Sequence, residues 1–150
     1  MNIVICILLI VISVICIYMV SLPVIKEHFV VSELKERLSV VDPKFKELDI
    51  REGHSSFTED KTIIYLCLKD EKGNYYPINT LVYVALHEIA HLINKQDFGH
   101  TKAFYEEFDK LLCAAADKGV YSASIPHPEL YCGVDIRGIT MPTCKFEDKK

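Results

Sequence analysis

The first segment of the chain, residues 1–25, contains no Asp, Glu, Lys or Arg, and from Ile3 to Val20 nearly every side chain is apolar. A helix needs roughly 20 such residues to cross about 30 Å of hydrocarbon. A cleaved signal peptide is the alternative. It usually has a basic start, a shorter apolar run and small residues before the cut, whereas Leu22-Pro23 stands where the cut would be sought. The segment therefore predicts an uncleaved transmembrane anchor at 1–25, followed by a folded domain at 26–150.

The charges that follow this segment bear on orientation. Lys26, Lys35 and Arg37 favour a cytosolic side for the domain, because basic residues next to a membrane span tend to stay in the cytosol. Acidic residues are mixed among them, at Glu33 for example, so the side stays open. We expect a single-pass membrane protein.

The charge balance of the chain indicates which partners it can bind. The chain has 17 basic and 21 acidic residues, a net charge of -4, and no basic stripe. Binding to nucleic acid needs clustered Lys and Arg, so we expect no direct nucleic-acid partner.

The six cysteines form no C-x-x-C pair, which indicates buried or idle thiols. Only Cys132 and Cys144 look free to pair, and only in an oxidising compartment.

The folded domain alternates strand-like and helix-like patterns. Apolar residues at helical spacing predict a helix over 30–41 that stops at Asp42-Pro43. Strands are expected within 45–50 and 57–69, the second being rich in β-branched and aromatic residues.

Two further helices complete the expected fold. Asn79 and Thr80 supply capping side chains for a helix over about 81–94, and Thr101 can cap a second helix that ends near Gly119. From Ser122 onward, prolines and glycines predict an irregular tail. Two helices packed on a small sheet give an α+β domain.

The first of these helices carries His87-Glu88-Ile89-Ala90-His91. Residues at i and i+4 project from one face of a helix, so His87 and His91 can bind one metal ion. Zinc is expected, because neutral imidazole suits it and a catalytic site leaves a fourth position for water. Glu88 stands beside this pair, as suits a base that takes a proton from water. The alternative is that the two histidines line a polar helix face without metal.

A catalytic zinc site normally has a third protein ligand. His100 is the favoured candidate, because Gly99 can adopt a left-handed turn that brings the chain back towards the first two imidazoles. The alternatives are carboxylates on the next helix: Glu106, Glu107 and Asp109.

The motif at 87–91, followed by Gly99-His100-Thr101-Lys102-Ala103-Phe104, resembles the WLM and SprT-like branch of zinc-dependent peptidases. The strand at 63–68 and Tyr131-Cys132-Gly133 also resemble small predicted metallopeptidases of large DNA viruses of eukaryotes. The resemblance covers about 57–133. Eight residues separate His91 from His100, more than is typical of WLM proteins.

The resemblance implies a zincin-like fold and hydrolysis of peptide bonds in a protein or peptide substrate. If the chain is viral, its anchor would lie in a host or virion membrane. An edge strand should pair with the substrate, and the strand around Ile64 is the candidate. Tyr131 or His127 could donate to the oxyanion. Two alternatives remain open: a catalytically silent zincin-fold structural protein of a membrane or virion, and a metal-dependent hydrolase with other substrates.

Overall fold

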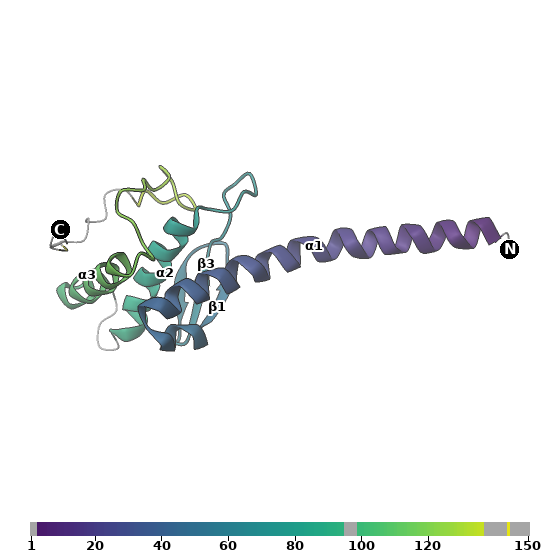
Figure 1. The fold of residues 1–150 in the computed structure, drawn as a ribbon. Coiled ribbons are helices and arrows are strands. Elements are labelled where there is room, and N and C mark those ends of the chain that lie inside the picture. Colours follow the sequence, from purple (N-terminus) through teal and green to yellow (C-terminus); the bar gives the residue numbers. More distant parts are fainter. Residues whose placement is uncertain (1–2, 95–98, 137–143, 145–150) are drawn as a thin grey trace. The chain divides into compact units, whose positions relative to one another are not determined.

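The computed structural model describes residues 3–94, 99–136 and 144, without the side chains of 20–28. The chain divides into two compact units, Met1–Glu33 and Leu34–Lys150 (Figure 1). The first helix, α1, has the bounds Ile3–Val41. The predicted helix over 30–41 is therefore the end of a longer one.

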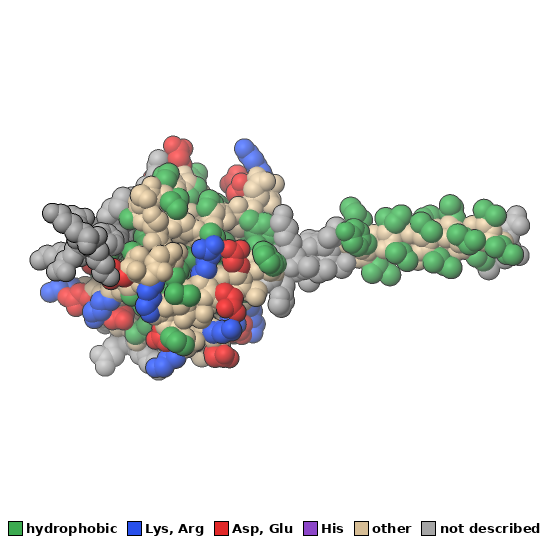
Figure 2. Space-filling view, in the orientation of Figure 1, with side chains coloured by type: hydrophobic (Ala, Val, Ile, Leu, Met, Phe, Trp, Pro, Cys, Tyr) green, Lys and Arg blue, Asp and Glu red, His purple; other side chains and the backbone are tan. Residues whose placement is uncertain are grey.

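The prediction of a transmembrane anchor at 1–25, and with it a single-pass membrane location, is wrong. Among the described residues, no helix is both long and apolar enough to span a membrane. The side chains described from Ile3 to Met19 are mostly exposed hydrophobic groups (Figure 2).

The second unit contains a three-stranded sheet. Its strands are β1 (Asp49–Glu52), β2 (Phe57–Glu59) and β3 (Ile63–Leu66), in the order β1-β3-β2. β3 pairs in parallel with β1 and antiparallel with β2. The strand around Ile64 is therefore central, and the prediction that it forms the edge is wrong. β2 occupies an edge instead.

The expected strands are shorter than predicted because two local structures interrupt them. Within 45–50, the 3-10 helix η1 (Pro43–Glu47) precedes β1, and the Asp42 side chain caps it by accepting from the Lys44 N–H. Within 57–69, Asp60 and Lys61 adopt positive φ values of 48° and 54°. Two central residues with positive φ are typical of a tight hairpin turn, which separates β2 from β3.

The helices α2 (Ile78–Ile93) and α3 (Lys102–Asp117) have the expected positions. α2 contacts α3 and the strands β2 and β3, so it lies between the sheet and α3 (Figure 1). Thr101 caps α3 by accepting from the Phe104 N–H, and Gly119 follows α3 with a φ of 69°, so both helix-end predictions are confirmed.

The start of α2 differs from the prediction. Its N-cap is Pro77, and Asn79 and Thr80 are buried in the first turn. The Asn79 amide bonds the backbone of Ser122, and the Thr80 hydroxyl bonds His127. These two side chains do not cap the helix because they attach the C-terminal segment to it.

The core of the second unit lies between α2, α3, β3 and the end of α1. Its fully buried side chains include Leu34, Leu38, Ile64, Leu66, Leu81, Leu86, Ile89, Phe104 and Leu112. The described segment 120–136 is irregular, as predicted, whereas the rest of the predicted tail lies outside the described residues apart from Cys144.

The cysteines pair differently from the prediction. Cys67 bonds Cys132 and Cys113 bonds Cys144, so the expected idle thiols of Cys67 and Cys113 are in disulfides, and Cys132 does not pair with Cys144. Cys6 and Cys16 are free. The prediction failed because the paired cysteines are 65 and 31 residues apart in sequence, and only the tertiary fold shows that they are neighbours.

Candidate metal centre

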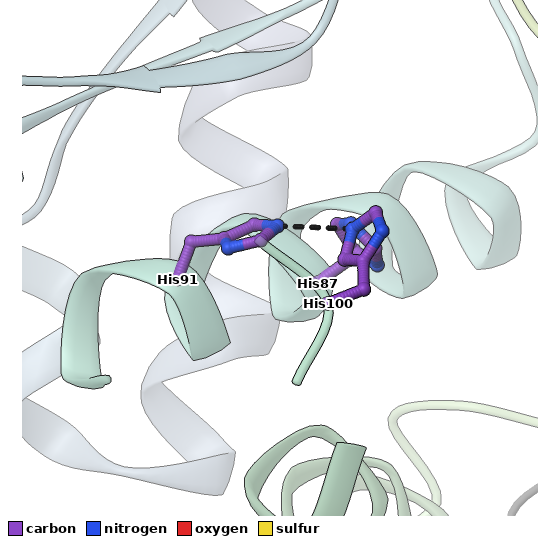
Figure 3. Close-up of side chains that lie close together, drawn as sticks. All are labelled: His87, His91 and His100. Atoms are coloured by element: carbon purple, nitrogen blue, oxygen red, sulfur yellow. Dashed lines mark hydrogen bonds between the residues drawn. The ribbon is translucent and has the colours of Figure 1, made fainter. Parts of the chain in front are cut away.

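Three imidazoles from two segments converge beside α2. His87 and His91 project from one face of α2, and His100 comes from the segment that precedes α3 (Figure 3). Nε2 of His100 lies 3.0 Å from Nε2 of His87 and 3.2 Å from Nε2 of His91. One nitrogen of each ring therefore points to a common centre.

The position of His100 depends on its neighbours in the chain. Gly99 has a φ of 120°, a value that side-chain-bearing residues rarely adopt, so glycine fits this turn.

Among the described residues, the group of side chains that could hold a metal ion consists of the three histidines alone. The carboxylates of Glu106, Glu107 and Asp109 are not part of it.

Phe104 of α3 supports the cluster from the protein interior. The side chain is fully buried, and its ring stacks on His91 at 4.2 Å with an interplanar angle of 28°. It also meets His87 edge to face at 4.9 Å. Packing against a rigid aromatic ring restricts the orientation of both imidazoles, so the cluster is preorganised.

The electrostatic environment keeps two of the rings neutral. Burial, followed by the nearby His91 and His100, lowers the pKa of His87 to about 3. Burial also lowers the pKa of His91, with further contributions from His100 and Lys61. Neutral imidazole is the form that binds metal ions.

The donor set fits a zinc ion. With Zn–N bonds of 2.0–2.1 Å, two tetrahedral ligands lie about 3.4 Å apart, close to the separations seen here. Hydrogen bonds between the rings do not account for this arrangement. Nε2 of His100 faces two nitrogens but can make only one hydrogen bond in the plane of its ring. One departure exists: Nδ1 of His87 is buried and has no hydrogen-bond partner among the described residues, although metal-bound histidines usually donate from the second nitrogen.

Glu88 lies next to the cluster and is only 6% exposed. Burial raises the pKa of its carboxyl to about 7, although the Thr58 hydroxyl opposes this rise by donating to Oε2 at 3.0 Å. Glu88 and the three histidines line a cavity of about 450 Å³, whose other lining residues are Ser56, Phe57, Thr58, Asp60, Lys61 and Gly99. A buried carboxyl that titrates near neutral pH in a cavity is suited to proton transfer.

The two predicted oxyanion donors lie elsewhere. The Tyr131 hydroxyl is buried, donates to the Cys67 carbonyl at 2.7 Å and lies 2.8 Å from the Ser56 hydroxyl. The ring nitrogens of His127 lie 3.3 Å from the Thr80 hydroxyl and 3.2 Å from the Tyr121 hydroxyl. Neither residue lines the cavity. Both have structural partners.

The sequence pattern did not predict that residues of the β2–β3 hairpin complete the cavity. Thr58 contacts Glu88 from 30 positions away in the sequence. Lys61 donates to the carbonyl of Asn94, the residue that caps the C-terminus of α2. No local pattern identifies these contacts, because they arise when the β2–β3 hairpin packs against α2.

Together, the fold and the site define an α+β protein with a candidate three-histidine metal centre on the helix of a HExxH motif. The chain belongs to a family of proteins found in large DNA viruses. Its relatives include Uncharacterized protein 136R of Invertebrate iridescent virus 6, which is 35% identical over 130 residues, covering 71% of this chain and 72% of the relative.

Two further relatives extend this family. Uncharacterized protein 042R of Invertebrate iridescent virus 3 is 40% identical over 60% of this chain, and Uncharacterized protein R325 of Acanthamoeba polyphaga mimivirus is 33% identical over 70%. The matched region spans 57% of the length of each of these two relatives. No family model matches the chain. No solved structure matches it either.

Proposed function

We propose that this protein is a zinc-dependent hydrolase that cleaves peptide bonds, with zinc held by His87, His91 and His100 and with Glu88 as the general base. The observation that carries the proposal is the convergence of three Nε2 atoms beside a buried carboxyl in one open cavity. A site with three protein ligands leaves a fourth position, and structural zinc sites usually close it with a fourth ligand.

The roles of the residues follow from their chemistry. When bound, zinc would polarise the scissile carbonyl, lower the pKa of water at its open position and favour the ionised form of Glu88. Glu88 would accept a proton from the attacking water and transfer it to the leaving amine. The cavity, with a volume of about 450 Å³, provides room for the substrate segment next to these groups.

The position of β2 favours a peptide as the substrate. β2 lies at an edge of the described sheet and contributes Phe57 and Thr58 to the cavity wall. An edge strand offers unpaired backbone groups, to which an extended peptide can add as a further strand. β2 therefore replaces the strand around Ile64 as the candidate substrate-binding strand. This arrangement also agrees with the resemblance to WLM and SprT-like peptidases, which remains part of the proposal.

The main alternative is a protein that keeps the three-histidine centre without catalysis. Glu88 argues against it, because a structural site needs no buried carboxyl with a pKa near neutrality. A hydrolase that acts on another class of substrate is the second alternative, and the edge position of β2 favours peptides over it.

The test is cleavage of a broad peptide library by the zinc-loaded full-length chain. Glu88→Gln is expected to retain zinc and lose cleavage, because the amide cannot accept the proton. Glu106→Gln is the matched control, since Glu106 is exposed on α3 and paired with Lys102, and it should cleave like the wild type. Cleavage by Glu88→Gln at the wild-type rate, or zinc-loaded wild type that cleaves nothing in the library, would reject the proposed function.

A further inference from the structure

The strand β2 directs one side chain towards α2. Side chains alternate along a strand, and Phe57 and Glu59 are exposed whereas Thr58 is half-buried. The Thr58 hydroxyl lies 3.0 Å from Oε2 of Glu88 and 3.1 Å from the carbonyl oxygen of the same residue. β2 is thus attached to α2 at the residue next to the candidate ligand His87.

This bond is important for the carboxyl of Glu88. Among the described residues, the side-chain donor to this carboxyl is the Thr58 hydroxyl, and Glu88 as a whole is only 6% exposed. A buried carboxylate needs a donor to offset its lost hydration, and a hydrogen bond to a charged group is stronger than a neutral one. The bond restricts the rotation of the carboxyl and leaves it with free lone pairs that can accept a proton.

The position of the Thr58 hydroxyl is itself fixed. Two residues earlier, the Ser56 hydroxyl accepts from the Cys67 N–H at 3.0 Å and lies 2.8 Å from the Tyr131 hydroxyl. On β2, Thr58 pairs with Ile64 of the central strand. The hydroxyl therefore projects from a strand that is anchored to β3 and, through Ser56, to Cys67 and Tyr131, and it can hold Glu88 in one orientation.

We propose that Thr58 is a positioning residue for Glu88, holding its carboxyl in the orientation that accepts a proton from water. This role rests on the proposed function of Glu88. The Thr58 hydroxyl acts through Glu88 and supplies no ligand to zinc, so its removal should change proton transfer and leave zinc binding intact.

The first test compares Thr58→Val, which keeps the shape of the side chain, with Thr58→Ser, which keeps the hydroxyl. Thr58→Val should lower kcat by about 10- to 100-fold, the effect of one hydrogen bond to a charged group. KM should stay within about twofold and zinc content should not change, since ligands and cavity wall are retained. Thr58→Ser should restore most of kcat. Thr62→Val, at an exposed position of the same hairpin, is the matched control and should behave like the wild type.

A second test does not depend on activity. In the zinc-free protein, Thr58→Val should lower the denaturant midpoint of unfolding in the wild-type background. It should have a smaller effect when Glu88 is already replaced by Ala, because the bond to the carboxyl is then absent and only the contact with the backbone carbonyl of residue 88 remains. Equal effects of Thr58→Val in both backgrounds would overturn the proposal.

The outcomes separate this proposal from the proposed function. An unchanged kcat in Thr58→Val, together with an inactive Glu88→Gln, would overturn the positioning role alone. A low kcat in both Thr58→Val and Thr58→Ser would also overturn it, because the hydroxyl would then not be the group that matters. An inert zinc-loaded wild type would overturn both proposals.

Discussion

Nε2 of His100 lies 3.0 Å from Nε2 of His87, although His87 belongs to α2 and His100 to the segment before α3. This contact joins the HExxH helix to the segment before α3 and adds a third histidine to the pair on α2. Because Phe104 of α3 packs against both rings, the position of α3 also determines the geometry of the group.

The first prediction concerns the third ligand. His100→Ala should weaken zinc binding by more than about 100-fold, because losing a ligand costs more than losing an outer hydrogen-bond partner, which costs about 10- to 100-fold. Competition titration with a zinc-sensitive chelating dye measures this affinity. His54→Ala is the control, since His54 is exposed outside the cavity. Unchanged affinity in His100→Ala would exclude this residue as a ligand.

The second prediction concerns pH. In the unfolded chain the carboxyl of Glu88 has a pKa of about 4.5, whereas burial raises it to about 7 in the folded zinc-free protein. Between these values the folded state binds the extra proton, so its contribution to stability is complete below about pH 4.5 and is lost as the pH rises through about 7. In chelator, wild type should therefore lose stability relative to Glu88→Gln across this interval.

Denaturant unfolding of both proteins at several pH values measures this difference. The comparison with Glu88→Gln cancels the titration of other groups, including His87, whose lowered pKa gives a stability change of the opposite sign. A difference that stays constant from pH 4 to 8 would contradict a raised pKa for Glu88.

The third prediction concerns the disulfide between Cys67 and Cys132, which closes a loop of 65 residues. Replacing both cysteines by serine should lower the free energy of unfolding by about 4 kcal/mol, mainly by freeing the unfolded chain. Differential scanning calorimetry under non-reducing conditions tests this. Cys16→Ser, at a free and exposed thiol, should have no such effect. An equal melting temperature for all three proteins would argue against the bond.

The fourth prediction concerns Tyr131, whose pKa is raised to about 12 by burial. Tyr131→Phe removes the hydroxyl that donates to the Cys67 carbonyl, so stability should fall by about 1–3 kcal/mol. Zinc affinity and KM should stay close to wild type, because Tyr131 does not line the cavity. A large loss of kcat with unchanged stability would instead restore Tyr131 as an oxyanion donor.

The elements that depend on local chemistry were predicted from the sequence. The Thr101 cap, the glycine stop at Gly119 and the helical spacing of His87 and His91 need only neighbours within a few residues. The α+β class of the second unit follows from the same patterns. His100 could be predicted as the third ligand because Gly99 indicates a turn close to the end of the helix.

The features that depend on remote contacts were not predicted. The pairing of Cys67 with Cys132, the bond from Thr58 to Glu88, and the edge position of β2 all depend on how the hairpin packs. The expected membrane anchor was wrong for another reason. The prediction rested on the length of residues 1–25 and on their lack of charge, whereas no helix among the described residues meets the combined requirement of length and apolarity.

The most direct measurement of the central claim is anomalous diffraction at the zinc edge from crystals of the zinc-loaded full-length protein. The account predicts one anomalous peak at about 2.0–2.1 Å from Nε2 of His87, His91 and His100, with a fourth position open to the cavity that Glu88 lines. The absence of a peak among these rings, or a peak bound by four protein ligands, would contradict it.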